Sequence, residues 1–311
     1  MTDPSPDTPL DPTMLARDHY ENFSVLSRLV PERLRDDFAA IYAFCRTADD
    51  LADETVHRFD DIADARAESL RLLADFRGQL AATYEGEPPS PAFQALARTV
   101  EKHQLPAGPF HKLLDAFEQD QTLVHYQTWD QLLGYCEGSA NPVGHLVLML
   151  FGVRPPEEDP ANTDRYRLSD AACTALQLAN HWQDVRRDLI ERDRVYIPAQ
   201  DTGVTPDQLR AWLDRKDDPE ARVPFIKMIR TLTDRTRELF DTAHPLPRTL
   251  GHEAGPVVRL LVLGGETILR KVEAIGGTTL WKRPEVSKLD KAALIARVSA
   301  EKLLGRYKVD T

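Results

Sequence analysis

Apolar residues recur every three or four positions through most of this chain, and this spacing constrains its fold more than any other feature. One run of this kind contains Leu34, Phe38, Ile41, Tyr42 and Cys45. Such spacing places side chains on one face of an α-helix, whereas alternate residues would share one face of a strand. Alternating patterns of the strand type are almost absent. The sequence therefore predicts an all-α protein.

Three groups of prolines interrupt the helical pattern. They are Pro88, Pro89 and Pro91, then Pro155, Pro156 and Pro160, and finally Pro245 and Pro247. Because proline has no amide hydrogen and clashes with the preceding turn, helices are expected to end at these points. Between and beyond the breaks, residues 171–189 and 257–275 are each expected to form one long helix.

No shift in composition along the chain marks a boundary between domains. The sequence therefore predicts a single domain over residues 15–305, in which the helices form a bundle around a central cavity. Residues 1–14 lack an apolar core and are predicted to form a disordered leader, and residues 306–311 are predicted to form a short C-terminal tail.

Charge and cysteine content limit the classes of function. The formal net charge is −11 and no basic stripe is present, so nucleic acid is not expected as a partner. The 3 cysteines lie far apart, which argues against a disulfide framework or a zinc site and fits a reducing cytoplasm. The longest apolar runs, residues 146–153 and 257–263, are much shorter than the ~20 residues of a membrane span. We expect a cytoplasmic protein, and a transient contact with a membrane surface stays open.

The first of two acidic clusters lies in residues 46–54. Asp49 and Asp53 are four residues apart, so on a helix they project from the same face about one turn apart. Their like charges repel, and Mg²⁺ would remove the repulsion by bridging the carboxylates to substrate phosphates. Arg46 lies near the same face, where it can pair with an aspartate or a phosphate. A solvated acidic face is the alternative, but the apolar residues 38–45 indicate that part of this helix is buried.

The second cluster is a polar stripe on an otherwise apolar helix. Gln177, Asn180, Asp184 and Asp188 follow one another at spacings of three, four and four. The stripe is either exposed and paired with neighbours such as Arg187, or its carboxylates and amides ligate magnesium. The occurrence of two such helices favours the second interpretation, in which the clusters face each other and bind a diphosphate leaving group through several metal ions.

Three ordered motifs resemble those of the squalene/phytoene synthase family. They occupy residues 42–54, 135–144 and 177–198, and the likeness extends over about residues 19–291. The resemblance implies a single-domain isoprenoid synthase fold and an enzyme that acts on isoprenoid diphosphates.

The resemblance also implies the residues of the site. Two or three Mg²⁺ ions are expected, with Asp49, Asp53, Asn180, Asp184 and Asp188 as ligands. The four aspartates among these would be the catalytic residues. The residues placed at the substrate are His19, Tyr20, Glu21, Asn22, Phe23, Tyr42, Arg46, Tyr135, Gln177, Gln183 and Arg283.

One segment narrows the choice within the family. Residues 19–23 read His-Tyr-Glu-Asn-Phe, where synthases of phytoene and dehydrosqualene usually have serines. This form resembles the hydroxysqualene synthase branch of bacterial hopanoid biosynthesis. The resemblance implies that presqualene diphosphate and water give hydroxysqualene and diphosphate, without NADPH. Tyr20, Glu21 or Asn22 would then position the water, unless Tyr20 and Asn22 bind diphosphate or cap a helix.

Two other functions are compatible with the sequence. The first is a head-to-head prenyl transferase that condenses two prenyl diphosphates to presqualene diphosphate, squalene or phytoene. The second is a non-catalytic isoprenoid-binding protein, against which the four intact aspartates argue.

Other residues of suggestive chemistry are expected to be structural. The tryptophans Trp129, Trp182 and Trp281 are predicted to pack rather than to surround a cation. The histidines His125, His145 and His181 lack the context of a metal motif or a catalytic triad.

Overall fold

Helices dominate residues 29–307, which are the part of the chain that the computed structural model describes. The only strand-like pairing within these residues is an isolated bridge between His125 and Val195. The predicted all-α class is therefore confirmed. The described residues fall into two compact units, one up to residue 122 and the other from residue 123. The predicted leader, residues 1–14, and most of the predicted tail lie outside the described residues.

The first unit is built around helix α3. Its helices are α3 (Arg35–Asp53), α4 (Ile62–Tyr84), α5 (Pro91–His103) and α6 (Gly108–Gln119), with short 3₁₀ helices at Glu32–Leu34 and Thr55–Arg58. Helix α3 packs against α4, α5 and α6. The ring of Phe44 on α3 lies 5.1, 6.4 and 5.0 Å from those of Phe76, Phe93 and Phe110, one from each neighbouring helix. This aromatic core holds one face of α3.

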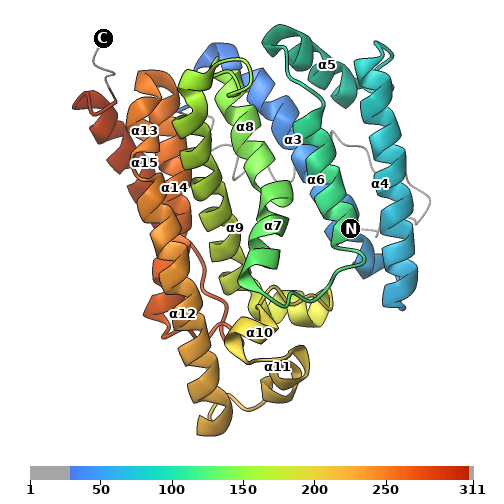
Figure 1. Cartoon of the computed structure of the whole chain (residues 1–311), viewed down its shortest axis with the longest axis vertical. Helices are drawn as coiled ribbons and strands as arrows, with labels where there is room; N and C mark the ends of the chain where they lie inside the picture. The colour runs from blue at the N-terminus through green and yellow to red at the C-terminus, as the bar shows by residue number, and fades with distance from the viewer. Residues whose placement is uncertain (1–28, 308–311) are drawn as a thin grey trace. The chain divides into compact units, whose positions relative to one another are not determined.

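The second unit is built around helix α9. Its helices are α7 (Trp129–Ser139), α8 (Asn141–Leu150), α9 (Thr163–Glu191), α10 (Ala199–Thr202), α11 (Pro206–Trp212), α12 (Pro219–Ala243), α13 (Leu246–Thr249), α14 (Gly251–Ala274) and α15 (Lys288–Leu303), with a 3₁₀ helix at Pro160–Asn162. Helix α9 packs against α7, α8, α12, α13 and α14, and its long axis runs beside α12 and α14 (Figure 1). Each acidic cluster therefore lies on the helix at the centre of its unit.

The predicted breaks are confirmed. The first proline group separates α4 from α5, the second separates α8 from α9, and the third separates α12 from α14, where the short helix α13 forms. Pro91 occupies the first turn of α5, and Ser90 caps that helix by accepting from the amide of Phe93. The predicted helix 171–189 lies within α9. The predicted helix 257–275 corresponds to α14, which begins earlier, at Gly251, and contains Pro256.

The expectation that tryptophans pack is confirmed for Trp182. Its side chain is fully buried, and its indole N–H donates to the hydroxyl of Thr236 on α12 at 2.8 Å. Trp129 stacks beside it, with ring centroids 6.4 Å apart. The guanidinium of Arg235 lies 4.7 Å from the Trp129 ring centroid, so the Trp129 ring makes a cation–π contact with this arginine.

No helix in the described part of the chain is both long and apolar enough to cross a membrane.

Alanine is expected to have opposite effects on stability at two adjacent glycines of α14, Gly264 and Gly265. A Cβ at Gly265 would overlap Leu176 Cδ2 and lie 2.8 Å from Phe240 Cζ, whereas one at Gly264 meets nothing within 4 Å. Gly264→Ala is expected to stabilise the fold by up to about 1 kcal/mol through helix propensity. Gly265→Ala is expected to destabilise it by about 1–2 kcal/mol, because overpacking outweighs the same gain.

Urea unfolding of the two glycine variants measures both effects, and each serves as the control for the other. Equal shifts of the same sign would show that α14 does not approach α9 and α12 as closely at Gly265 as the structure indicates.

Candidate active site

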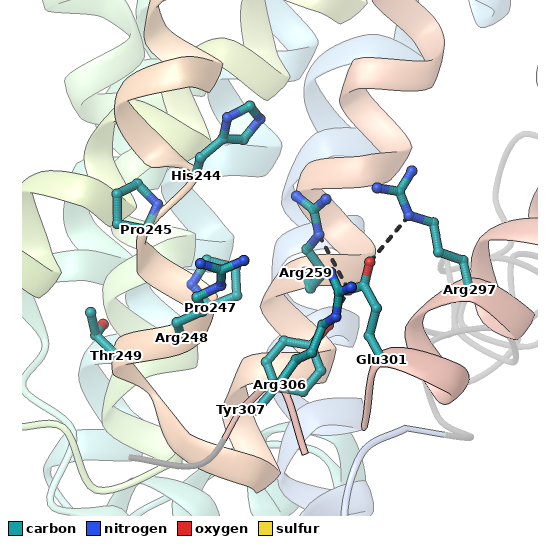
Figure 2. Close-up of a pocket in the computed structure, with 10 residues that line it drawn as sticks. All are labelled: His244, Pro245, Pro247, Arg248, Thr249, Arg259, Arg297, Glu301, Arg306 and Tyr307. Atoms are coloured by element: carbon teal, nitrogen blue, oxygen red, sulfur yellow. Dashed lines mark hydrogen bonds and ion pairs between the residues drawn. The ribbon is translucent and has the colours of Figure 1, made fainter. Parts of the chain in front are cut away.

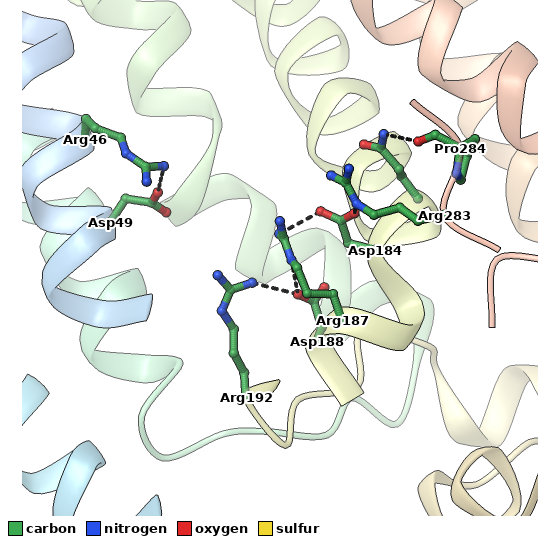
Figure 3. Close-up of polar contacts among 9 residues, drawn as sticks. Arg46, Asp49, Asp184, Arg187, Asp188, Arg192, Arg283 and Pro284 are labelled. Carbon is green, nitrogen blue, oxygen red and sulfur yellow. Dashed lines mark hydrogen bonds and ion pairs between the residues drawn. The ribbon is translucent and has the colours of Figure 1, made fainter. Parts of the chain in front are cut away.

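The acidic cluster of the first unit, which we call the α3 cluster, consists of Arg46, Asp49, Asp50 and Asp53. Arg46 donates to Asp49 at 2.8 Å, and its other terminal nitrogen lies 2.5 Å from Asp50 (Figure 3 shows the Arg46–Asp49 pair). Asp49 and Asp53 are partly exposed, whereas Asp50 is only 3% exposed. The predicted pairing of Arg46 with an aspartate is confirmed, and Asp49 and Asp53 stay accessible from solvent.

Asp50 is a member of this cluster that the spacing argument did not single out. Removing a carboxylate from water is costly unless a cation compensates it, and Arg46 supplies that cation. A signal was present in the sequence, because Arg46 and Asp50 are four residues apart on one helix. Arg46 therefore links a buried carboxylate to one that faces solvent.

The two titratable side chains that precede Arg46 are held neutral. Burial raises the pKa of the Cys45 thiol to about 12, and the charge of Asp49 adds to this effect. Burial also raises the pKa of the Tyr42 hydroxyl, which is half-buried. Both are therefore protonated at neutral pH, and Cys45 is not a reactive thiolate.

The acidic cluster of the second unit, which we call the α9 cluster, consists of Gln177, Asn180, Asp184 and Asp188. The stripe runs along α9 from the exposed Asn180 to two buried carboxylates, each 6% exposed. Gln177 is partly exposed. The predicted stripe is therefore not an exposed face as a whole, because its two carboxylates are buried.

Arginines surround the two buried carboxylates. Asp184 lies 2.6 Å from Arg187 and 2.5 Å from Arg283, one at each of its oxygens. Asp188 lies 2.9 Å from Arg192 and 3.8 Å from Arg187. Figure 3 shows Arg187 reaching toward both carboxylates. The cluster therefore combines two buried carboxylates with the buried Arg192 and the partly exposed Arg187 and Arg283.

Arg187 and Arg192 were not predicted as site residues. Arg187 is 38% exposed, and Arg192 only 9%. The spacing of Asp184 to Arg187 and of Asp188 to Arg192 is three and four residues, so a search for helical ion pairs would have indicated both. Arg194, which is 4% exposed, belongs to the same turn, and its amide donates to the carbonyl of Asp188.

The segment between α14 and α15 is attached to the α9 cluster at two adjacent positions. Gln183 donates to the carbonyl of Pro284 at 2.7 Å, and Arg283 donates to Asp184 at 2.5 Å. Burial alone would lower the pKa of Arg283, but the hydrogen bond to Asp184 and its charge outweigh burial and raise that pKa. Arg283 is therefore charged throughout the usual pH range, and its predicted contact with diphosphate stays a prediction.

Tyr135 lies in an aromatic group rather than alone. It is 4% exposed, and its ring centroid lies 5.5 Å from that of Tyr126 and 5.6 Å from that of Tyr196. His181 stacks on Tyr196 at 3.7 Å, so this histidine belongs to the same aromatic group. The roles of Tyr135, Tyr42, Gln177 and Gln183 in binding substrate stay predictions.

The residues present suit magnesium by their chemistry. Asp49, Asp53, Asp184 and Asp188 offer carboxylate oxygens and Asn180 an amide oxygen, the hard donors that Mg²⁺ prefers. No group of three or more His, Cys, Asp or Glu side chains within residues 29–307 is arranged to hold a metal ion. The magnesium assignment therefore stays a prediction. Residues 19–23, which carry five of the predicted substrate contacts, lie outside the described part of the chain.

Comparison with known proteins shows the family to which this chain belongs. The family model for squalene/phytoene synthase matches residues 16–290, so this chain belongs to that family of isoprenoid biosynthetic enzymes. A hydroxysqualene synthase of Rhodopseudomonas palustris is 31% identical over 81% of this chain and 80% of its own length. A phytoene synthase of Pseudescherichia vulneris is 28% identical over 88% of this chain and 85% of its own.

A solved structure extends the comparison. The crystal structure of squalene synthase HpnC from Alicyclobacillus acidocaldarius is 40% identical to this chain, with a TM-score of 0.70. The match covers 85% of this chain and 92% of that one. The predicted isoprenoid synthase fold is therefore confirmed, together with the predicted membership of the family.

Proposed function

We propose that this protein is a hydroxysqualene synthase, which ionises presqualene diphosphate and captures the cation with water. The observation that carries the proposal is the pair of buried carboxylates Asp184 and Asp188, which arginines surround on a helix of a squalene/phytoene synthase family member. The branch is supported by the resemblance of residues 19–23 and by the hydroxysqualene synthase among the relatives.

The proposed reaction is balanced without a reductant. The bond between the substrate carbon and the diphosphate oxygen breaks, and the electron pair leaves with diphosphate. The cyclopropylcarbinyl cation that remains rearranges, and a water oxygen forms the new carbon–oxygen bond. One proton is released from that water, so the products are hydroxysqualene, diphosphate and a proton, and NADPH is not required.

The arginines of the α9 cluster are suited to stabilise the charge that develops on diphosphate. Arg187 and Arg283 are 38% and 41% exposed, and both contact Asp184. A guanidinium offers a planar fork of donors that matches a phosphate as well as a carboxylate. Because both cations are held in place before the reaction, little reorganisation accompanies departure of the leaving group.

The proposal assigns the carboxylates of both clusters to magnesium. The ligands would be Asp49, Asp53, Asn180, Asp184 and Asp188, which would hold two or three ions. When bound, Mg²⁺ neutralises the diphosphate and stabilises it as a leaving group. In the α3 cluster, Arg46 would keep Asp49 oriented, because the two are already joined at 2.8 Å.

A head-to-head condensation of two prenyl diphosphates is the second candidate. The phytoene synthase relative, which matches a larger share of this chain than the hydroxysqualene synthase relative, favours it. The two reactions share the departure of diphosphate and differ in what captures the cation, an alkene or a water molecule.

Identification of the product by mass spectrometry separates the two candidates. Purified protein receives MgCl₂ and presqualene diphosphate without reductant, and a parallel sample receives farnesyl diphosphate. We expect an alcohol with the mass of hydroxysqualene in the first sample and no prenyl product in the second. In H₂¹⁸O the alcohol is expected to gain 2 mass units, because its oxygen comes from solvent.

The outcomes are distinct. Presqualene diphosphate or squalene in the farnesyl sample would assign the protein to the condensing enzymes. An alcohol without ¹⁸O would exclude capture of the cation by solvent water. Absence of product from both samples would contradict the proposed substrates.

A further inference from the structure

A cavity of about 510 Å³ lies in the second unit, between α13, α14 and α15. We call it the arginine pocket. It is lined by His244, Pro245, Pro247, Arg248, Thr249, Arg259, Arg297, Glu301, Arg306 and Tyr307. Figure 2 shows Arg259, Arg297 and Glu301 on one side of this space and Arg248 with Pro245 and Pro247 on the other. None of these residues belongs to the α3 or the α9 cluster.

The pocket has more positive than negative charge. Glu301 is the only carboxylate among its lining residues, and it faces four arginines. Arg297 donates to Glu301 at 3.2 Å, Arg259 lies 3.6 Å from it, and the Tyr307 hydroxyl donates to it at 2.6 Å. Burial alone would raise the pKa of Glu301, but these contacts lower it, so Glu301 is ionised at neutral pH.

Two of the arginines are available to an external anion. Arg248 and Arg306 are exposed, and within residues 29–307 neither has an ion pair. His244, which also lines the pocket, already contacts Glu266 at 2.5 Å. A surplus of about three positive charges is therefore gathered on a chain whose net charge is −11, which marks this pocket as a local site for anions.

Exposed apolar side chains accompany the pocket. Leu303 and Leu304 are 89% and 75% exposed, and they lie in the chain between Glu301 and Arg306, which both line the pocket. Leucines rarely stand so fully in water side by side unless they meet another surface. Cations next to exposed leucines are the combination that binds the interface of an anionic bilayer.

We propose that this face docks on anionic phospholipid membranes, with a headgroup phosphate in the arginine pocket and with Leu303 and Leu304 in the acyl boundary. A soluble phosphate compound would use the arginines but not the two leucines, so the bilayer explains more of the surface. The proposal goes beyond the proposed function and does not depend on it, because membrane binding is measured without substrate. Together they would place the enzyme where an oily prenyl substrate is dissolved.

Flotation with vesicles tests the proposal on the full chain. Vesicles of phosphatidylcholine alone are compared with vesicles that contain phosphatidylglycerol, at low and at high salt. We expect binding to the anionic vesicles only, and its loss at high salt, because screening weakens such contacts. Arg248→Glu combined with Arg306→Glu is expected to reduce this binding about tenfold or more. Leu303→Ser combined with Leu304→Ser is expected to reduce it by a similar factor.

Matched controls lie on the same unit. Lys227→Glu with Arg230→Glu makes the same change of charge on the exposed face of α12, outside the pocket. Leu289→Ser removes a leucine that is 83% exposed near the other end of α15, about 21 Å along the helix from Leu303. Both controls are expected to bind anionic vesicles within about twofold of the natural protein.

Several results would overturn the proposal. The first is equal binding to both kinds of vesicle. The second is unchanged binding of the variant with Arg248→Glu and Arg306→Glu. The third is an equal loss of binding in the control variant with Lys227→Glu and Arg230→Glu. A thermal shift with inorganic diphosphate that disappears only in the pocket variant, without vesicle binding, would assign the pocket to soluble phosphates instead. Turnover of detergent-solubilised substrate is expected to be unchanged in the pocket variant, which separates this proposal from the proposed function.

Discussion

Replacing Asp184 by asparagine is expected to lower kcat for diphosphate release by roughly 10²–10³-fold. Asp184 uses one oxygen for Arg187 and the other for Arg283. Asparagine keeps the shape of the side chain but carries no charge, and its nitrogen cannot accept from either guanidinium. The variant therefore loses a proposed magnesium ligand and the group that positions two cations. Steady-state assays of released diphosphate measure the effect.

Folding must be separated from chemistry in this test. Asp164→Asn is a matched control on the same helix, because Asp164 is 84% exposed and its only ion pair within residues 29–307 is with Arg167, at 3.4 Å. This control is expected to keep kcat within about twofold. Circular dichroism and urea unfolding of both variants establish that α9 is intact.

A readout other than turnover tests the metal directly. MgCl₂ with inorganic diphosphate is expected to raise the Tm of the natural protein, because a ligand that binds only the folded state stabilises it. Asp184→Asn is expected to lose most of this shift. Full turnover together with an unchanged shift would show that Asp184 only pairs with its arginines.

The helices of this protein could be predicted in position but not in extent. The spacing of apolar residues indicated a helix at 171–189, and α9 spans Thr163–Glu191. The pattern failed at the start of α14, which includes Gly251 and Pro256 ahead of the predicted start. Proline lacks one hydrogen bond but still takes helical angles, so tertiary packing of the buried Pro256 keeps it in the helix.

Contacts within one helix were accessible from the sequence, and contacts between segments were not. The pairing of Arg46 with Asp49 follows from a separation of three residues. Arg283 and Asp184 are separated by 99 residues, and no periodicity relates them; only the resemblance to the family indicated Arg283. The hydrogen bond from Gln183 to the carbonyl of Pro284 could not be predicted from the sequence either, because it depends on where the segment after α14 returns to α9.

Replacing Trp182 by alanine is expected to lower the free energy of unfolding by about 3–5 kcal/mol. The side chain is fully buried between α9 and α12, and its indole N–H donates to the buried hydroxyl of Thr236. Alanine leaves a cavity that two packed helices cannot close, and urea unfolding measures the loss. Trp182→Phe keeps most of the volume and removes the hydrogen bond, so a loss of about 1 kcal/mol is expected.

Trp129 provides the comparison for this prediction. It stacks on Trp182 but is partly exposed, so Trp129→Ala is expected to cost less than Trp182→Ala. Equal costs for the two alanine variants would contradict the packing that the structure assigns to Trp182.

The Trp182 and Asp184 variants should differ in kind, although the residues are two positions apart on α9. Trp182 faces α12 and fixes the helix, whereas Asp184 meets Arg187 and Arg283. We therefore expect Trp182→Ala to reduce stability strongly, and to reduce kcat only as far as α9 becomes loose. Asp184→Asn should instead reduce kcat strongly and lower stability less than Trp182→Ala does, because Arg187 and Arg283 are partly exposed and stay solvated. If stability and kcat fell by the same proportion in both variants, the α9 cluster would serve the fold rather than the reaction.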